Sequence, residues 1–132
     1  MVRDVTSDAL LERLRAIIAR LPDVTETVTW GHPTWRVGGE RGKIICGYGE
    51  ERGAHRVSFK VRDELRSDLL ADPRYRVAPY VGRFGWLDYD LDAGKPDWKQ
   101  ISALIAMSHE LIGAAATRRT AKPRAAKPRR RA

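Results

Sequence analysis

Residues 25–61 read TETVTWGHPTWRVGGERGKIICGYGEERGAHRVSFKV, and this stretch decides the fold. Apolar and polar residues alternate in short segments that are separated by glycine-rich breaks, which is typical of half-buried strands joined by turns. The segments predicted as strands are 27–30, 34–37, 43–48 and 55–61. Strands joined by such short links pair antiparallel, so the stretch predicts a meander.

Helical periodicity flanks the meander. Leucine and isoleucine recur on one helical face from Leu10 to Leu21, behind the start signals Ser7 and Asp8, and the pattern ends at Pro22. This segment predicts an amphipathic helix before the first strand.

The second half of the body alternates helix and strand. Asp63 is expected to cap a short helix that stops near Pro73, and two strands are expected around 75–77 and 85–91. A last helix is predicted to begin at Asp97. Its apolar face consists of Trp98, Ile101, Leu104, Ile105, Ser108 and Ile112.

This element order, one helix, four strands, one helix, two strands and one helix, predicts an α+β fold. An antiparallel sheet with the helices packed on one face, in two layers, satisfies it. The body has the length of one ordinary domain. We therefore expect an α+β domain over residues 1–116, followed by a separate segment, 117–132.

The whole net charge lies in residues 117–132. The chain has 25 Lys and Arg against 17 Asp and Glu, and this segment holds eight of the basic residues and no acid. The basic residues are Arg118, Arg119, Lys122, Arg124, Lys127, Arg129, Arg130 and Arg131. The body is left formally neutral. The segment also contains the near-repeat AKPRA-AKPRR, and its prolines and like charges predict a tail that is disordered when free.

Composition argues against several classes of protein and site. No apolar run approaches the roughly 20 residues that span a bilayer, and the N-terminus lacks the pattern of a signal peptide, so we expect a cytoplasmic protein with no membrane partner. Cys46 lies in an apolar run and is expected to be a buried, unreactive thiol. His32, His55 and His109 have no metal-ligand spacing. We expect no metal, no cofactor and no catalytic residues.

Three sequence blocks, residues 30–39, 57–61 and 78–87, together resemble the MmcQ/YjbR family of small bacterial proteins, and the ending from Asp97 resembles that family's last helix. The resemblance implies an α+β fold of the CyaY-like or secretion-chaperone-like kind, and the family is commonly called DNA-binding. The chain departs from the family pattern at Glu40 and at His109. The basic tail is not part of the family core.

Candidate nucleic-acid contacts in the body are Arg36, Lys60, Arg83 and Trp86. Strand alternation places Arg36 and Lys60 opposite the core, and it places Trp86 away from Leu87. The alternative is an ordinary solvated face, because the body is neutral. A second hypothesis is a small pocket with His32, Trp35 and Tyr80, although aromatic residues are more often core and His32 could simply fix a turn.

The sequence thus favours a non-catalytic DNA-binding protein whose tail makes sequence-independent phosphate contacts. It leaves open two alternatives: a protein-interaction or chaperone-like module, and a small-ligand pocket or enzyme. DNA is the expected partner, with the tail placing the protein on the nucleoid. A protein partner and a monomer or a dimer both remain compatible with the sequence.

Overall fold

The computed structural model describes residues 2–51 and 53–130, with side chains for residues 9–50 and 53–115. Within these residues it contains three α-helices, six strands and one 3-10 helix. In chain order they are α1 (Val2–Ile18), β1 (Val24–Thr29), β2 (His32–Val37), β3 (Lys43–Glu51), β4 (Ala54–Lys60), α2 (Asp63–Leu70), β5 (Tyr75–Val77), η1 (Gly82–Phe84), β6 (Trp86–Asp90) and α3 (Trp98–Arg130).

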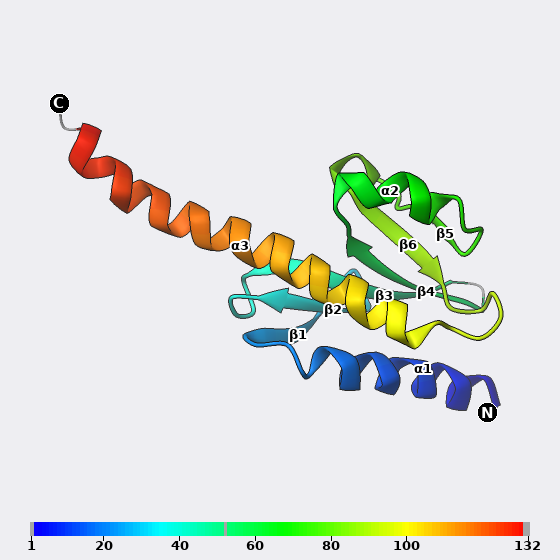
Figure 1. The fold of residues 1–132 in the computed structure, drawn as a ribbon. Coiled ribbons are helices and arrows are strands. Elements are labelled where there is room, and N and C mark those ends of the chain that lie inside the picture. Colours follow the sequence, from blue (N-terminus) through cyan, green and yellow to red (C-terminus); the bar gives the residue numbers. More distant parts are fainter. Residues whose placement is uncertain (1, 52, 131–132) are drawn as a thin grey trace.

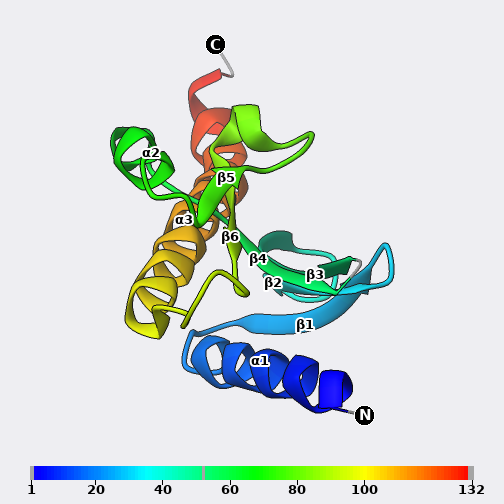
Figure 2. The same cartoon turned by 90° about the vertical axis from the view of Figure 1, so that its right-hand side faces the viewer.

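The six strands form one antiparallel sheet in the order β1-β2-β3-β4-β6-β5. The first four strands are neighbours in chain order, which confirms the predicted meander. Helix α3 contacts β2, β3 and β4, while α2 contacts β5 and α1 contacts α3. Figure 2 shows the helices gathered on one side of the strands, so the α+β fold with helices on one face is confirmed.

Alternation along β4 shows how the sheet divides its side chains. His55, Val57 and Phe59 are buried beneath the helices, while Arg56 and Ser58 point to the opposite, open face. The core between sheet and helices is made of buried apolar side chains from α1, the strands and α3. It includes Leu14, Ile45, Cys46, Val57, Phe59, Leu87, Tyr89, Ile101 and Ile105.

Ser108 fixes α3 to the sheet from inside this core. The side chain is fully buried, and its hydroxyl donates to the Ile45 carbonyl at 2.6 Å and accepts from the Lys60 backbone N–H at 3.0 Å. The hydroxyl therefore bridges β3 and β4 just beyond their last paired residues, Cys46 and Phe59. This supplies partners for two backbone groups that the ladder leaves open.

Both terminal helices are longer than the sequence predicts. Helix α1 begins at Val2 rather than near Ser7, and α3 continues to Arg130 rather than ending near residue 116. Alanine, arginine and lysine have high helix propensity, which favours continuation, whereas the prediction gave more weight to Pro123 and Pro128. Figure 1 shows the last part of α3 extending beyond the sheet. The expectation that this segment is disordered in the free protein stays a prediction.

Candidate functional site

The open face of the sheet carries a cavity of about 510 Å³, which we call the open-face cavity. Its walls come from β1 to β4, from the start of β6 and from the loop before η1. The lining residues are Thr29, Trp30, His32, Thr34, Arg36, Lys43, Ile44, Gly47, Tyr48, Gly49, Arg56, Ser58, Val81 and Trp86. In Figure 2 the β1–β2 turn and the loop before η1 both project on the side that the helices leave uncovered.

Two glycines in the middle of the sheet make room for the cavity. Gly47 lies between Thr34 of β2 and Ser58 of β4, and Gly49 lies opposite Arg56. A Cβ at Gly47 would stand 3.7 Å from the Thr34 methyl group, while a Cβ at Gly49 would stand 3.1 Å from the Arg56 guanidinium carbon. The floor is therefore bare backbone, bordered by the Thr34 methyl group and by Ser58, and a ligand can approach it more closely than it could approach a floor of side chains.

Arg36 is held rigidly at one end of the cavity. Its guanidinium donates to the Thr27 and Thr29 hydroxyls, both at 3.2 Å, and to the Gly42 carbonyl at 2.7 Å. The Thr34 hydroxyl joins the same network at 2.7 Å from Thr27 and 3.0 Å from Thr29. Because these contacts fix the guanidinium, less rotamer freedom is lost when it binds an anion.

A buried carboxylate positions the second arginine. Asp88 is only 2% exposed, accepts a hydrogen bond from the Ser58 hydroxyl at 2.5 Å and lies 3.3 Å from Nε of Arg56. The residue points to the open face, but its neighbours on β4 cover it.

The rim of the cavity is aromatic. Trp30, at the β1–β2 turn, is 93% exposed. Its φ of +57° and the Gly31 φ of +81° are both left-handed, which is typical of a two-residue hairpin turn. Trp86 and Val81 border the other side. Tyr80, next to Val81, is 96% exposed and also has a positive φ of +66°, but it does not line the cavity.

The structure brings some predicted site residues together and separates others. Arg36, His32 and Trp86 meet at the open-face cavity. His32 is the first residue of β2 and pairs with Thr29, directly after the Trp30–Gly31 turn. The expectation that Trp35 lines a pocket is wrong: it is buried on the helix side, opposite Cys46.

Lys60 and Arg83 lie at a neighbouring hollow of about 350 Å³, together with Arg62, Phe84 and Leu111 of α3. The Arg83 guanidinium stands 4.9 Å from the centre of the Phe84 ring. Two acids, Asp63 and Glu64, border the same hollow, so its charge is mixed.

The predicted tail contacts fall on residues whose side chains the structure leaves undescribed. Arg118, Arg119, Lys122, Arg124, Lys127, Arg129 and Arg130 belong to α3 by backbone alone, and Arg131 lies outside the described residues. Their role stays a prediction.

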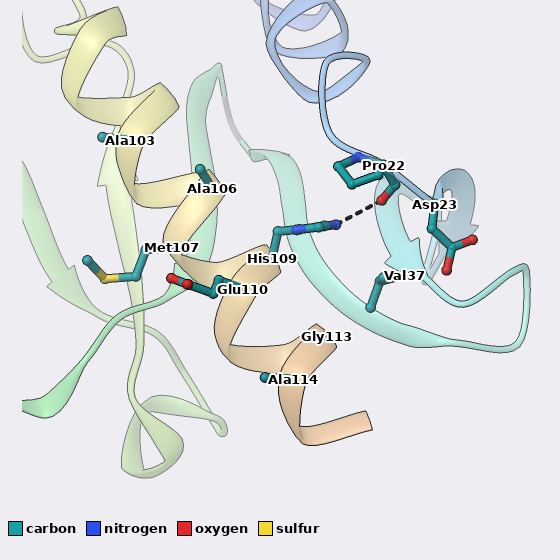
Figure 3. A pocket seen from close by; sticks show the side chains of 10 residues that line it. All are labelled: Pro22, Asp23, Val37, Ala103, Ala106, Met107, His109, Glu110, Gly113 and Ala114. Carbon is teal, nitrogen blue, oxygen red and sulfur yellow. Dashed lines mark hydrogen bonds between the residues drawn. The ribbon is translucent and has the colours of Figure 1, made fainter. Parts of the chain in front are cut away.

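A third hollow, of about 740 Å³, runs beside α3 and the β1–β2 edge (Figure 3). Its walls are mainly small or apolar, including Ala103, Ala106 and Gly113. His109 reaches across it, and its Nε2 lies 2.8 Å from the Pro22 carbonyl. That hydrogen bond ties α3 to the loop between α1 and β1, which is a structural role.

His55 is a buried histidine with two acidic neighbours. It is 4% exposed, its Nδ1 lies 3.0 Å from Asp92 Oδ1, and its Nε2 faces Glu50 at 3.6 Å. Burial also raises the pKa of the Cys46 thiol, in agreement with the expectation of a buried, unreactive cysteine. Among the described residues there is no cluster of three or more potential metal ligands. The same residues include no helix long and apolar enough to cross a membrane.

Sequence and structure comparisons place this arrangement among known proteins. The family model described as YjbR matches residues 19–111. The crystal structure of Deinococcus radiodurans protein DR2400, which carries a DUF419 domain, superposes with a TM-score of 0.68 at 21% identity and covers 77% of each chain. A Pseudomonas syringae protein gives 0.62 at 17% identity, covering 76% of this chain and 97% of its own. These two structural similarities support the fold and carry no information about function. None of the curated proteins is a significant match.

Proposed function

The chain belongs to the YjbR family, and from that premise we propose that it is a non-catalytic DNA-binding protein whose basic segment, residues 117–132, makes sequence-independent phosphate contacts. The observation that carries the proposal is the separation of charge. Eight basic residues and no acid follow a body with 17 of each sign. Such a segment neutralises phosphates and releases their counterions without reading bases. We place the protein in the cytoplasm, on the nucleoid.

The geometry of α3 supports this proposal. The helix is anchored on the sheet through Ser108, and its ribbon then extends beyond the body toward the C-terminus (Figure 1). The basic segment is thereby presented away from the neutral body, where a duplex can approach it without meeting the body's acids.

Lys60 and Arg83 are the body residues best placed to add contacts. Their hollow includes Leu111 of α3, so it lies on the side from which the basic segment departs. Arg36 and Trp86, the other two body residues predicted to contact nucleic acid, line the open-face cavity instead. We therefore assign the body a minor share of DNA binding.

The test is duplex binding as a function of salt for three proteins: the full chain, a chain ending at residue 116, and a full-length variant with the eight basic residues replaced by Gln. If all eight engage phosphates, the logarithm of the binding constant should fall with the logarithm of salt with a slope near −7. The two altered proteins should bind the duplex much more weakly, and their binding should depend little on salt. Equal binding by all three would refute the role of the segment.

Exposed apolar side chains support one alternative, a protein-interaction module. Val77, Tyr80, Val81 and Phe84 lie exposed around η1, and Val28 and Trp30 lie exposed on the β1–β2 hairpin. A dimer in analytical ultracentrifugation that Tyr80→Ser and Phe84→Ser dissociate would favour this function. A monomer at all concentrations would count against self-association.

A further inference from the structure

We propose that the open-face cavity binds a small aromatic oxyanion, a molecule about the size of a nucleotide that joins a flat ring to a phosphate or a carboxylate. The site does not involve residues 117–132. The inference therefore goes beyond the proposed DNA binding and stands or falls separately from it.

Cationic side chains line the open-face cavity. The lining contains the permanent cations Arg36, Lys43 and Arg56 and no carboxylate, although the body as a whole is neutral. Arginine recognises oxyanions through paired N–H donors. Arg36 is fixed by three hydrogen bonds, and the Asp88 carboxylate stands at 3.3 Å behind Arg56, so both guanidinium groups are held in place before any ligand arrives.

Trp30 is an exposed tryptophan in a left-handed turn position. A left-handed backbone is uncommon for a bulky residue, and the first position of this hairpin turn favours Asn, Asp or Gly. The side chain is 93% exposed, so it adds little buried area to the fold. Stability does not account for a tryptophan here. An indole at the rim of a cationic cavity does provide a face on which a ring can stack.

Size and depth complete the argument. The volume of about 510 Å³ lies inside the range of about 300–1,000 Å³ that is usual for small-molecule sites. Gly47 and Gly49 expose the floor, where Gly47 lies between Thr34 and Ser58. Trp30 borders one side and Val81 with Trp86 the other, so aromatic side chains stand on both sides of the cavity.

The experiment is isothermal titration of the full-length protein with six probes. Adenosine monophosphate and indole-3-acetate each carry a ring and an oxyanion. Adenosine and indole carry only the ring of each, and inorganic phosphate and acetate carry only the anion. We expect at least one complete probe to bind at submillimolar concentration, and its separate halves to bind at least tenfold more weakly. A preference between the two complete probes identifies phosphate or carboxylate as the anion.

Two substitutions test the location. Gly47→Val should fill the cavity from its floor, because a Cβ there meets the Thr34 methyl at an ordinary 3.7 Å and a β-branched residue suits a strand. Trp30→Asn removes the ring and supplies a residue that the turn prefers. Both variants should keep or raise the melting temperature and lose at least tenfold in affinity, whereas a merely structural tryptophan would show no loss of binding.

Controls separate this proposal from DNA binding. The variant with eight basic residues changed to Gln should keep full affinity for the small probe, and Gly47→Val should keep full affinity for duplex DNA. Absence of binding by both complete probes, or unchanged affinity in Gly47→Val, would overturn the proposal. If Gly47→Val fails to fold, Trp30→Asn decides in the same way.

Discussion

Replacing Ser108 with alanine should destabilise the protein far more than the loss of one oxygen atom suggests. The hydroxyl is fully buried and serves two backbone groups at once, the Ile45 carbonyl at 2.6 Å and the Lys60 N–H at 3.0 Å. In Ser108→Ala both groups lose this partner at the point where β3 and β4 separate.

The magnitude follows from these two contacts. Each buried polar group left without a partner lowers the free energy of unfolding by about 1–3 kcal/mol. Alanine offsets roughly 0.5 kcal/mol of this loss because its helix propensity is higher than that of serine. We expect a net loss of about 2–4 kcal/mol in the free energy of unfolding. For a domain of this size, that loss lowers the melting temperature by roughly 10 °C.

Urea denaturation followed by tryptophan fluorescence measures this loss. The urea dependence of the free energy should stay unchanged, because the substitution does not alter the surface exposed on unfolding. Ser102→Ala is the matched control, since Ser102 lies half-buried in the same helix. If the free energy of unfolding of Ser108→Ala lies within about 0.5 kcal/mol of that of Ser102→Ala, the two hydrogen bonds contribute no net stability and the reasoning fails.

Three further predictions concern the body. In Gly42→Ala the new Cβ would overlap the Val37 carbonyl. We therefore expect the free energy of unfolding, measured by thermal denaturation, to fall by more than about 2 kcal/mol. A wild-type melting temperature would contradict the close approach. Asp92→Ala removes the acceptor that stands 2.5 Å from the His55 N–H and 3.0 Å from its ring. The cost should be about 1–3 kcal/mol by chemical denaturation. Burial raises the pKa of Cys46, so the unfolded chain releases this proton first and stability should fall as pH rises above about 8.5. Cys46→Ala should remove that component, and an unchanged pH profile in the variant would show that other groups cause it.

The strands could be predicted from the sequence because their signal is local. Alternation and glycine breaks identify β2, β5 and the β3–β4 hairpin to within a few residues. The ends of α1 and α3 could not be predicted as well, because helix ends depend on competing propensities. In residues 117–130 alanine and arginine favour a helix that the two prolines oppose.

The candidate site could be predicted only in part because it depends on register. A shift in pairing between Trp35 and Arg36 lets Ile44 line the open-face cavity while Ile45 enters the core. Alternation alone does not reveal such a bulge. The positions of Gly47 and Gly49 on either side of Tyr48 are the signal that could have indicated a hollow, because two glycines on the same face of a strand leave a gap.

The layers of the fold predict that the two proposed sites act independently. Helix α3 contacts β3 and β4 from the helix side, and the open-face cavity lies on the opposite side of the same strands. A duplex bound to the segment beyond residue 116 is therefore held past the end of the sheet and off the face that carries the cavity. Saturating the chain with duplex DNA at low salt should change the affinity for the aromatic oxyanion less than twofold. A larger change would mean that the duplex reaches the open face, and Arg36 and Trp86 would then return to the set of DNA contacts.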